Sequence, residues 1–179
     1  MLIRNTESRY GIIAIILHWT MALLLIGLLL LGLYMTRIPI SIEKLKLYGW
    51  HKEYGELALM LALLRIMWRL GSIIPLLSDR IPLWQRIAAH SVHWAFYIFM
   101  FALPISGWLI TSAAGLPVSF FGLFVIPNLI TPQPDLQPLF TFIHKWISYG
   151  LIVTIFAHVG AALKHHFINK DDILRRLLP

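Results

Sequence analysis

The chain has 179 residues, of which 59% are hydrophobic and only 13% are charged, and its mean hydropathy is +0.76. A soluble domain of this length needs a charged surface, so these values exclude an ordinary soluble globular protein. The net charge of +7 does not indicate nucleic-acid binding, because the basic residues stand between long apolar runs instead of forming one stripe.

The sequence contains no cysteine. This excludes iron–sulfur clusters, thiolate metal sites and covalently attached haem. Any metal must therefore be held by histidine or by oxygen ligands.

Four mostly apolar stretches, each about long enough to cross a bilayer, follow one another along the chain. They cover residues 11–35, 51–70, 89–112 and 140–165. The longest connection, residues 113–139, contains five prolines, which exclude a regular helix through it, and we expect it to lie on the bundle as a cap. No repeat or low-complexity tract interrupts the pattern, so residues 1–179 are predicted to form one all-α domain, a four-helix transmembrane bundle.

An even number of crossings places both termini on one side of the membrane, and the distribution of Lys and Arg indicates which side this is. The side with the termini holds Arg4, Arg9, Arg65, Arg69, Arg80, Arg86, Lys164, Lys170, Arg175 and Arg176. The other side holds Arg37, Lys44, Lys46, Lys52 and Lys145. Because the cytoplasmic side carries the excess of basic residues, both termini are predicted to be cytoplasmic.

Histidines are frequent for so apolar a chain. Six of the eight lie in or at the edge of the predicted helices: His18, His51, His90, His93, His144 and His158. An ionisable side chain within a membrane is costly, and its default interpretation is functional.

The spacing of His144 and His158 suggests how these side chains are used. Fourteen residues correspond to almost whole helical turns, so both imidazoles lie on one face of the fourth helix, about 21 Å apart along its axis. By membrane depth, His18 is level with His158 on the cytoplasmic side, and His51 is level with His144 on the periplasmic side. Two facing imidazoles at one level are the axial ligands of a six-coordinate b-type haem, so we predict two haems, each with a histidine-bound iron.

Two alternatives stay open near the cytoplasmic pair. Arg65 shares the face of His51 fourteen residues later, where it is either a partner of a haem propionate or an arginine that extends to the lipid headgroups. His93 lies at a depth from which it competes with His18 as a ligand. His165 and His166 end the last helix and are better explained as a cap or interfacial anchor.

The sequence resembles the bacterial cytochrome b561 family of four-helix di-haem membrane cytochromes over nearly its whole length. The matching pieces are Leu17-His18-Trp19, His51 with Gly55, the run Ala102 to Gly107, His144-Lys145-Trp146, the run Ala157 to Ala162, and the ending from His165 to Pro179. The resemblance implies the same four haem ligands, His18, His51, His144 and His158. It also implies a multi-pass protein of the bacterial inner membrane that exchanges electrons with ubiquinone.

One branch of that family oxidises superoxide at the periplasmic face and reduces ubiquinone, and this is the activity that we expect. The five basic residues on the periplasmic side are placed to attract a small anion. Lys145 stands where relatives often have an acidic residue, which leaves the donor open between superoxide and a redox protein. The alternatives are a haem-binding anchor and electron-transfer subunit of a hydrogenase or dehydrogenase, and a colourless proton-linked transporter that uses the histidines as relays.

Overall fold

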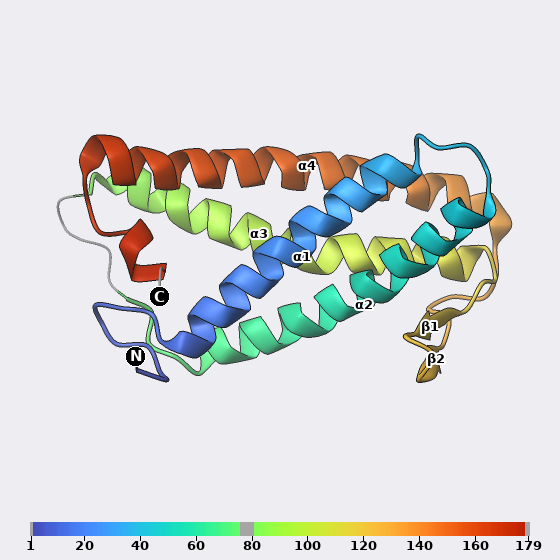
Figure 1. Cartoon of the computed structure of the whole chain (residues 1–179), viewed down its shortest axis with the longest axis horizontal. Coiled ribbons are helices and arrows are strands. Elements are labelled where there is room, and N and C mark those ends of the chain that lie inside the picture. Colours follow the sequence, from blue (N-terminus) through green and yellow to red (C-terminus); the bar gives the residue numbers. More distant parts are fainter. Residues whose placement is uncertain (1, 76–80, 178–179) are drawn as a thin grey trace.

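The computed structural model describes residues 2–75 and 81–177, and four long helices dominate it (Figure 1). They are α1 (Ile12–Met35), α2 (Ile42–Leu70), α3 (Leu83–Ala113) and α4 (Gln137–Leu163). The N- and C-terminal regions lie at one end of the bundle, which we call the terminal end. The opposite end carries a small β-hairpin and is called the hairpin end.

Three helical segments in the described part of the chain are long and apolar enough to cross a membrane: Ile12–Met35, Leu83–Ala113 and Pro134–Asn169. Such segments are typical of a helical membrane protein. The remaining long helix, α2, is too polar to qualify by composition, because it carries His51, Lys52, Glu53, Glu56, Arg65 and Arg69.

Helix α2 begins at Ile42, well before the predicted start near His51. The side chain of Ser41 accepts a hydrogen bond from the backbone N–H of Lys44 at 3.1 Å, which caps the helix, and Glu43 in the first turn favours the positive end of the helix dipole. Apolarity alone misplaced this boundary, because the cap starts the helix in a polar segment. Lys44, Lys46 and Lys52 therefore stand on a helix and not in a loop.

The other helices also differ from the predicted ranges at their ends. Helix α3 starts at Leu83, directly after Pro82, and α4 starts at Gln137 with Pro138 in its first turn. A proline is tolerated there because the first-turn N–H groups have no partner within the helix. The last helix continues as a π-helical turn, Lys164–Asn169, and a 3₁₀ turn, Leu174–Leu177, lies beyond it. Arg80 and Pro179, used above in the charge count and the family signature, lie outside the described residues.

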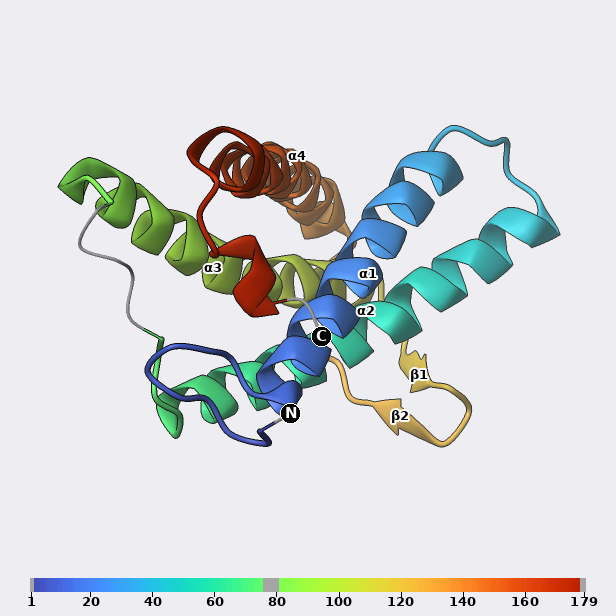
Figure 2. The same cartoon turned by 60° about the vertical axis from the view of Figure 1, so that its left-hand side comes forward.

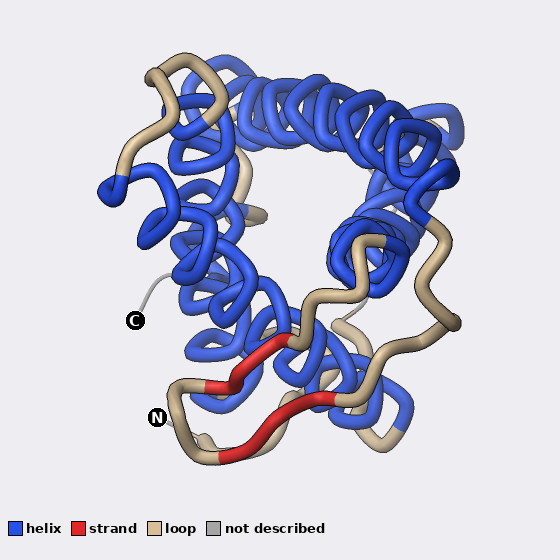
Figure 3. Tube along the Cα trace, turned by 90° about the vertical axis from the view of Figure 1, so that its right-hand side faces the viewer, coloured by secondary structure: helices blue, strands red, loops and turns tan. Residues whose placement is uncertain are grey.

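The connection between α3 and α4 contains a β-hairpin, which corrects the prediction of a purely helical chain. Strand β1 (Val118–Phe120) pairs antiparallel with β2 (Phe124–Ile126), and a 3₁₀ turn (Pro134–Leu136) leads into α4. Viewed from the hairpin end, the strands lie at the side of the ring of helices and not across it (Figure 3). The sequence predicted that this connection covers the end of the bundle. The hairpin instead lies beside α2, and β1 packs against that helix.

The helices pack in the order α1 on α2, α2 on α3 and α3 on α4 (Figures 1 and 2). One apolar cluster joins all four near the middle of the bundle: Met21, Leu25, Ala62, Tyr97, Met100, Leu103 and Leu151. Leu151 is fully buried and lies midway between His144 and His158 along α4. The cluster therefore separates two levels of histidines along the bundle axis.

Candidate functional site

The structure brings together both predicted histidine pairs. The imidazole centroids of His18 and His158 are 6.3 Å apart, near the terminal end, and those of His51 and His144 are 6.2 Å apart, near the hairpin end. Helix α4 supplies one ring to each pair, because the two α4 histidines share a face. Both pairs are at least half buried, and none of the four rings is exposed.

Each pair joins two helices that are not neighbours in the packing order. His18 belongs to α1 and His51 to α2, and within the described chain neither α1 nor α2 is among the helices that pack extensively against α4. The imidazoles thus face each other where the helix backbones stand apart.

The surroundings of His144 fix one edge of its ring. Its Nδ1 lies 2.9 Å from the hydroxyl of Ser106 and 3.1 Å from the carbonyl oxygen of Leu103, and the Ser106 hydroxyl itself donates to that carbonyl at 2.8 Å. Because the Ser106 hydroxyl already donates its proton to the Leu103 carbonyl, Nδ1–H of His144 is the donor in both of its contacts. The lone pair of the neutral ring is then on Nε2 and is free to bind a metal.

Two glycines let the hairpin-end rings approach a neighbouring helix. A Cβ on Gly107 would lie 3.5 Å from Cε1 of His144, and a Cβ on Gly32 would lie 3.3 Å from Cε1 of His51. Nδ1 of His51 is buried and has no hydrogen-bond partner among the described residues. A buried ring nitrogen without a partner is costly in a structural histidine and argues that this ring is kept for another purpose.

Arg65 turns inward to the terminal-end pair. Its Nη2 lies 3.3 Å from Nδ1 of His18, and its Nη1 donates to the carbonyl oxygen of Leu17 at 3.4 Å. Of the two interpretations left open by the sequence, the headgroup-facing arginine does not describe this conformation. The C-terminal segment also reaches this region, where the indole N–H of Trp19 donates to the carbonyl oxygen of Leu177 at 2.9 Å.

His93 reaches the same level as predicted, and its ring centroid is 5.8 Å from that of His158. It comes from α3, which packs directly along α4, and the ring of Phe96 fills the adjacent position at 5.1 Å from His158. The α3 side of His158 is therefore occupied by the side chains of His93 and Phe96. At the end of the chain, His165 pairs with Asp171 across the π-helical turn.

Sequence reasoning missed the residues that orient His144. Ser106 and Gly107 lie within the run Ala102 to Gly107, but no spacing or composition relates them to a histidine 38 residues away. A proline, a serine and a glycine in the middle of an apolar helix are a signal that this part of α3 has a special neighbour. Only the pairing of α3 with α4 identifies which neighbour it is.

The hairpin end carries basic residues close to its histidine pair. Lys52 directly follows His51, and Lys145 directly follows His144 and is exposed. Acidic residues accompany them at the same end: Glu43, Glu53, Glu56 and Asp135. The net charge of this end is thus nearly balanced, and an attraction for anions has to act locally, beside the two histidines.

Comparison with known proteins agrees with this architecture. The family model of prokaryotic cytochrome b561 matches residues 9–179. Cytochrome b561 homolog 2 of Escherichia coli K12 is 36% identical over 97% of this chain and 93% of its own length. Cytochrome b561 homolog 1 of the same organism is 40% identical over 55% of each chain. A protein of Yersinia pestis named probable superoxide oxidase CybB is 29% identical over 97% of each chain. The chain therefore belongs to the prokaryotic cytochrome b561 family, whose members bind haem b and transfer electrons in bacterial membranes.

Proposed function

We propose that the protein is a di-haem cytochrome of the bacterial inner membrane that oxidises superoxide at the periplasmic face and reduces ubiquinone. The observation that supports it most is the presence of two imidazole pairs, each joining α4 to a helix that is not among its extensive packing partners in the described chain. The similarity to a probable superoxide oxidase supports the choice of substrate. In the net reaction two superoxide anions, one ubiquinone and two protons give two dioxygen molecules and one ubiquinol.

The ring separations fit a shared iron. A metal–imidazole nitrogen bond is about 2 Å long and the ring centre lies about 1 Å behind the nitrogen, so two imidazoles on one metal have centres about 6 Å apart. The observed separations are 6.3 and 6.2 Å. We assign His18 and His158 to the cytoplasmic-side haem and His51 and His144 to the periplasmic-side haem. A bound haem takes up and releases one electron at its iron, and two haems at two depths connect the membrane faces.

Arg65 has to change partner when His18 acts as a ligand. An arginine only donates hydrogen bonds, so its contact with Nδ1 requires a lone pair there, and the proton of the neutral ring is then on Nε2. Ligation through Nε2 instead requires the proton on Nδ1. The contact between Arg65 and His18 would therefore open, and the guanidinium would be free to hold a propionate of the bound haem.

His93 is assigned a place beside the haem rather than a bond to iron. Its separation from His158 would also suit a shared iron, but it comes from α3, which packs directly along α4, and Phe96 of the same helix contacts the His158 ring. His18 comes from α1, which is not among the helices that pack extensively against α4 in the described chain. The choice between His18 and His93 is tested below by counting haems.

Reduced-minus-oxidised spectra with pyridine-haemochrome quantitation test the proposal directly. We expect about two b-type haems per chain, both low-spin because each iron has two imidazoles. Superoxide should then reduce the purified oxidised protein, and added ubiquinone should reoxidise it. A ratio near one haem, or a dominant high-spin ferric signal, would contradict the two-pair assignment, and haems that superoxide does not reduce would contradict the substrate alone.

The hydrogen bonds of His144 predict a change in the potential of one haem. A hydroxyl that accepts from Nδ1–H makes the imidazole a stronger donor to iron and favours the ferric state. Ser106→Ala removes one of the two acceptors of Nδ1–H and leaves the Leu103 carbonyl, so the midpoint potential of the periplasmic-side haem should rise by at most the worth of one hydrogen bond. A hydrogen bond worth about 1 kcal/mol corresponds to about 40 mV for one electron.

Spectroelectrochemical titration measures this shift, and Ser106→Thr, which keeps a hydroxyl, should restore the original value. The potential of the cytoplasmic-side haem should stay unchanged in both variants. If Ser106→Ala shifted both potentials equally, or shifted neither, the hydrogen bond would have no specific role in tuning His144.

The orientation of the chain is a separate prediction. With ten Lys and Arg on the side of the termini against five on the other, the terminal end is expected in the cytoplasm. A reporter that is active only in the cytoplasm should work when fused after Pro179, and one that is active only in the periplasm should work when fused after Gln133, beyond the third helix. The opposite pattern would invert the assignment of the two haems to the two membrane faces.

A further inference from the structure

We infer that the β1–β2 hairpin is a membrane anchor whose apolar tip inserts into the outer-leaflet interface beside α2. The connection that contains it has no Asp, Glu, Lys or Arg from residue 113 to residue 134. The other connection at the same end of the bundle, together with the first turns of α2, contains Arg37, Glu43, Lys44 and Lys46. At this end of the molecule the connection between α1 and α2 is charged, whereas the connection that contains the hairpin is uncharged and largely apolar. Only the charged connection is well solvated by water.

The apolar side chains of the hairpin are turned outward. Leu123 is 77% exposed, Val125 62% and Phe124 54%, and Leu116 and Leu129 at the two ends of the hairpin are also exposed. Only Val118 on β1 is buried in the protein among the strand residues. An exposed apolar patch formed by a segment without any charged residue marks a surface that something apolar covers.

The tip of the hairpin carries an apolar residue at a conformational cost. Phe121 and Gly122 both have positive φ, 50° and 72°, as the two central residues of a type I′ turn do. Asn or Asp usually occupies the first of these positions, and a bulky side chain there is strained. This chain has Phe121 instead, whose ring packs on that of Tyr54 at 5.2 Å. The geometry of the turn does not favour an apolar residue at this position. The choice of Phe121 is therefore explained by what its side chain contacts.

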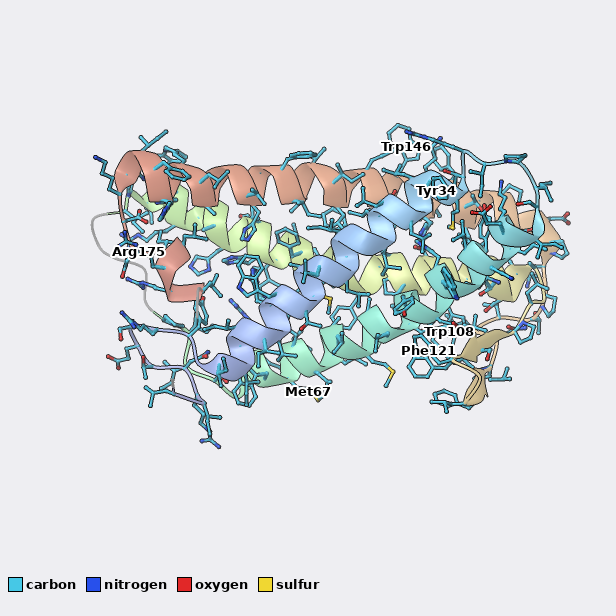
Figure 4. The ribbon with its side chains drawn as sticks, viewed as in Figure 1. Tyr34, Met67, Trp108, Phe121, Trp146 and Arg175 are labelled. Atoms are coloured by element: carbon cyan, nitrogen blue, oxygen red, sulfur yellow. The ribbon has the colours of Figure 1, made fainter. Side chains whose placement is uncertain are left out.

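The position of the hairpin agrees with a depth at the membrane interface. The hairpin projects to one side of the ring of helices at this end of the bundle (Figure 3). Trp108 and Phe121 lie at this end, and so do Tyr34 and Trp146, while Arg175 lies at the other (Figure 4). Aromatic residues at this level are typical of the boundary between headgroups and acyl chains.

The backbone of the tip is prepared for a place with little water. The N–H of Leu123 donates to the carbonyl oxygen of Phe120 at 2.9 Å, and the N–H of Gly122 donates to the hydroxyl of Ser119 at 3.2 Å. The outer edges of a two-stranded sheet still carry unpaired backbone groups, which the hydrocarbon core does not tolerate. The hairpin therefore belongs in the interface, with its tip side chains about 5–10 Å into the boundary between headgroups and acyl chains.

The cysteine-free sequence permits a direct test by site-directed spin labelling. Leu123→Cys and Phe124→Cys would each carry a nitroxide in nanodiscs of phosphatidylethanolamine and phosphatidylglycerol. Collision with oxygen and with a water-soluble nickel chelate then reports depth. Gln133→Cys, in the same connection, is the aqueous control, and Leu23→Cys, 70% exposed on α1, is the lipid control.

We expect both hairpin labels to be more accessible to oxygen than to nickel, at a depth between those of the two controls. Nickel accessibility equal to that of Gln133→Cys would place the hairpin in water and overturn the inference. Spin–spin broadening between hairpin labels that disappears on dilution with unlabelled protein would show that a second copy of the chain covers the tip, and this would overturn it as well. None of these outcomes depends on the haems or on superoxide.

Discussion

Purified protein with His144→Ala should contain about one haem per chain instead of about two, and His158→Ala should give the same number with the other haem missing. Each α4 histidine is half of one pair, so its loss should release the haem of that pair, while the other pair, about 21 Å away along the helix, stays intact. His51→Ala should reproduce the spectrum of His144→Ala, and His18→Ala that of His158→Ala. Pyridine-haemochrome quantitation and low-temperature EPR would measure both the number and the spin state.

Combined variants sharpen this test. His51→Ala with His144→Ala should still retain one haem, because both belong to one site, whereas His51→Ala with His158→Ala should retain none in low-spin form. His93→Ala should keep two haems, and His90→Ala serves as the matched control from the same helix. If His93→Ala lost the cytoplasmic-side haem and His18→Ala kept it, then α3, not α1, would supply the second ligand.

Reversing Lys145 should slow the reduction of the oxidised protein by superoxide, by about tenfold at low ionic strength. Lys145 directly follows a predicted haem ligand and is exposed, so its charge acts on an anion arriving at the hairpin end. Joint reversal of Lys44, Lys46 and Lys145 should slow it further. Because salt screens charges over a Debye length of about 10 Å at 0.1 M, the rate for the unmodified protein should fall as salt rises.

Lys170→Glu is the matched control, since it makes the same change of charge at the terminal end and should leave the rate unchanged. Stopped-flow measurements in neutral detergent avoid the contribution of lipid headgroups, and an unchanged haem spectrum verifies each variant. A rate that responds neither to salt nor to Lys145→Glu would disprove steering by these lysines. If superoxide failed to reduce the haems at all, a partner-fed electron-transfer subunit of a hydrogenase or dehydrogenase would become the better proposal.

The sequence predicted the helical framework and the two levels of histidine well, because both depend on local periodicity. Fourteen residues between His144 and His158 place two imidazoles on one face of any regular helix, whatever packs around it. Apolar length likewise predicted all four long helices, although only three of them are apolar enough to qualify as membrane spans by composition. It misplaced the start of α2, where the Ser41 cap extends the helix into a polar segment that hydropathy does not recognise.

The tertiary structure decided which helices meet and how the side chains between them are turned. Periodicity left His18 and His93 as rivals, and the packing of α3 along α4, with Phe96 beside His158, distinguishes their surroundings. Ser106 and Leu103 act on His144 across two helices, and the inward turn of Arg65 depends on α1. These contacts join residues 38 or more positions apart, and no local preference of the chain encodes them.

The hairpin is the clearest case of this division. The prolines correctly excluded a helix, and the lack of charge was visible in the sequence, but neither indicated whether the segment lies over the bundle or beside it. The side-by-side contact of β1 with α2 and of Phe121 with Tyr54 decides that position, because packing against a distant helix fixes where a short hairpin points. The sequence thus determined the composition of this segment, and the tertiary structure determined that its apolar tip is exposed beside α2.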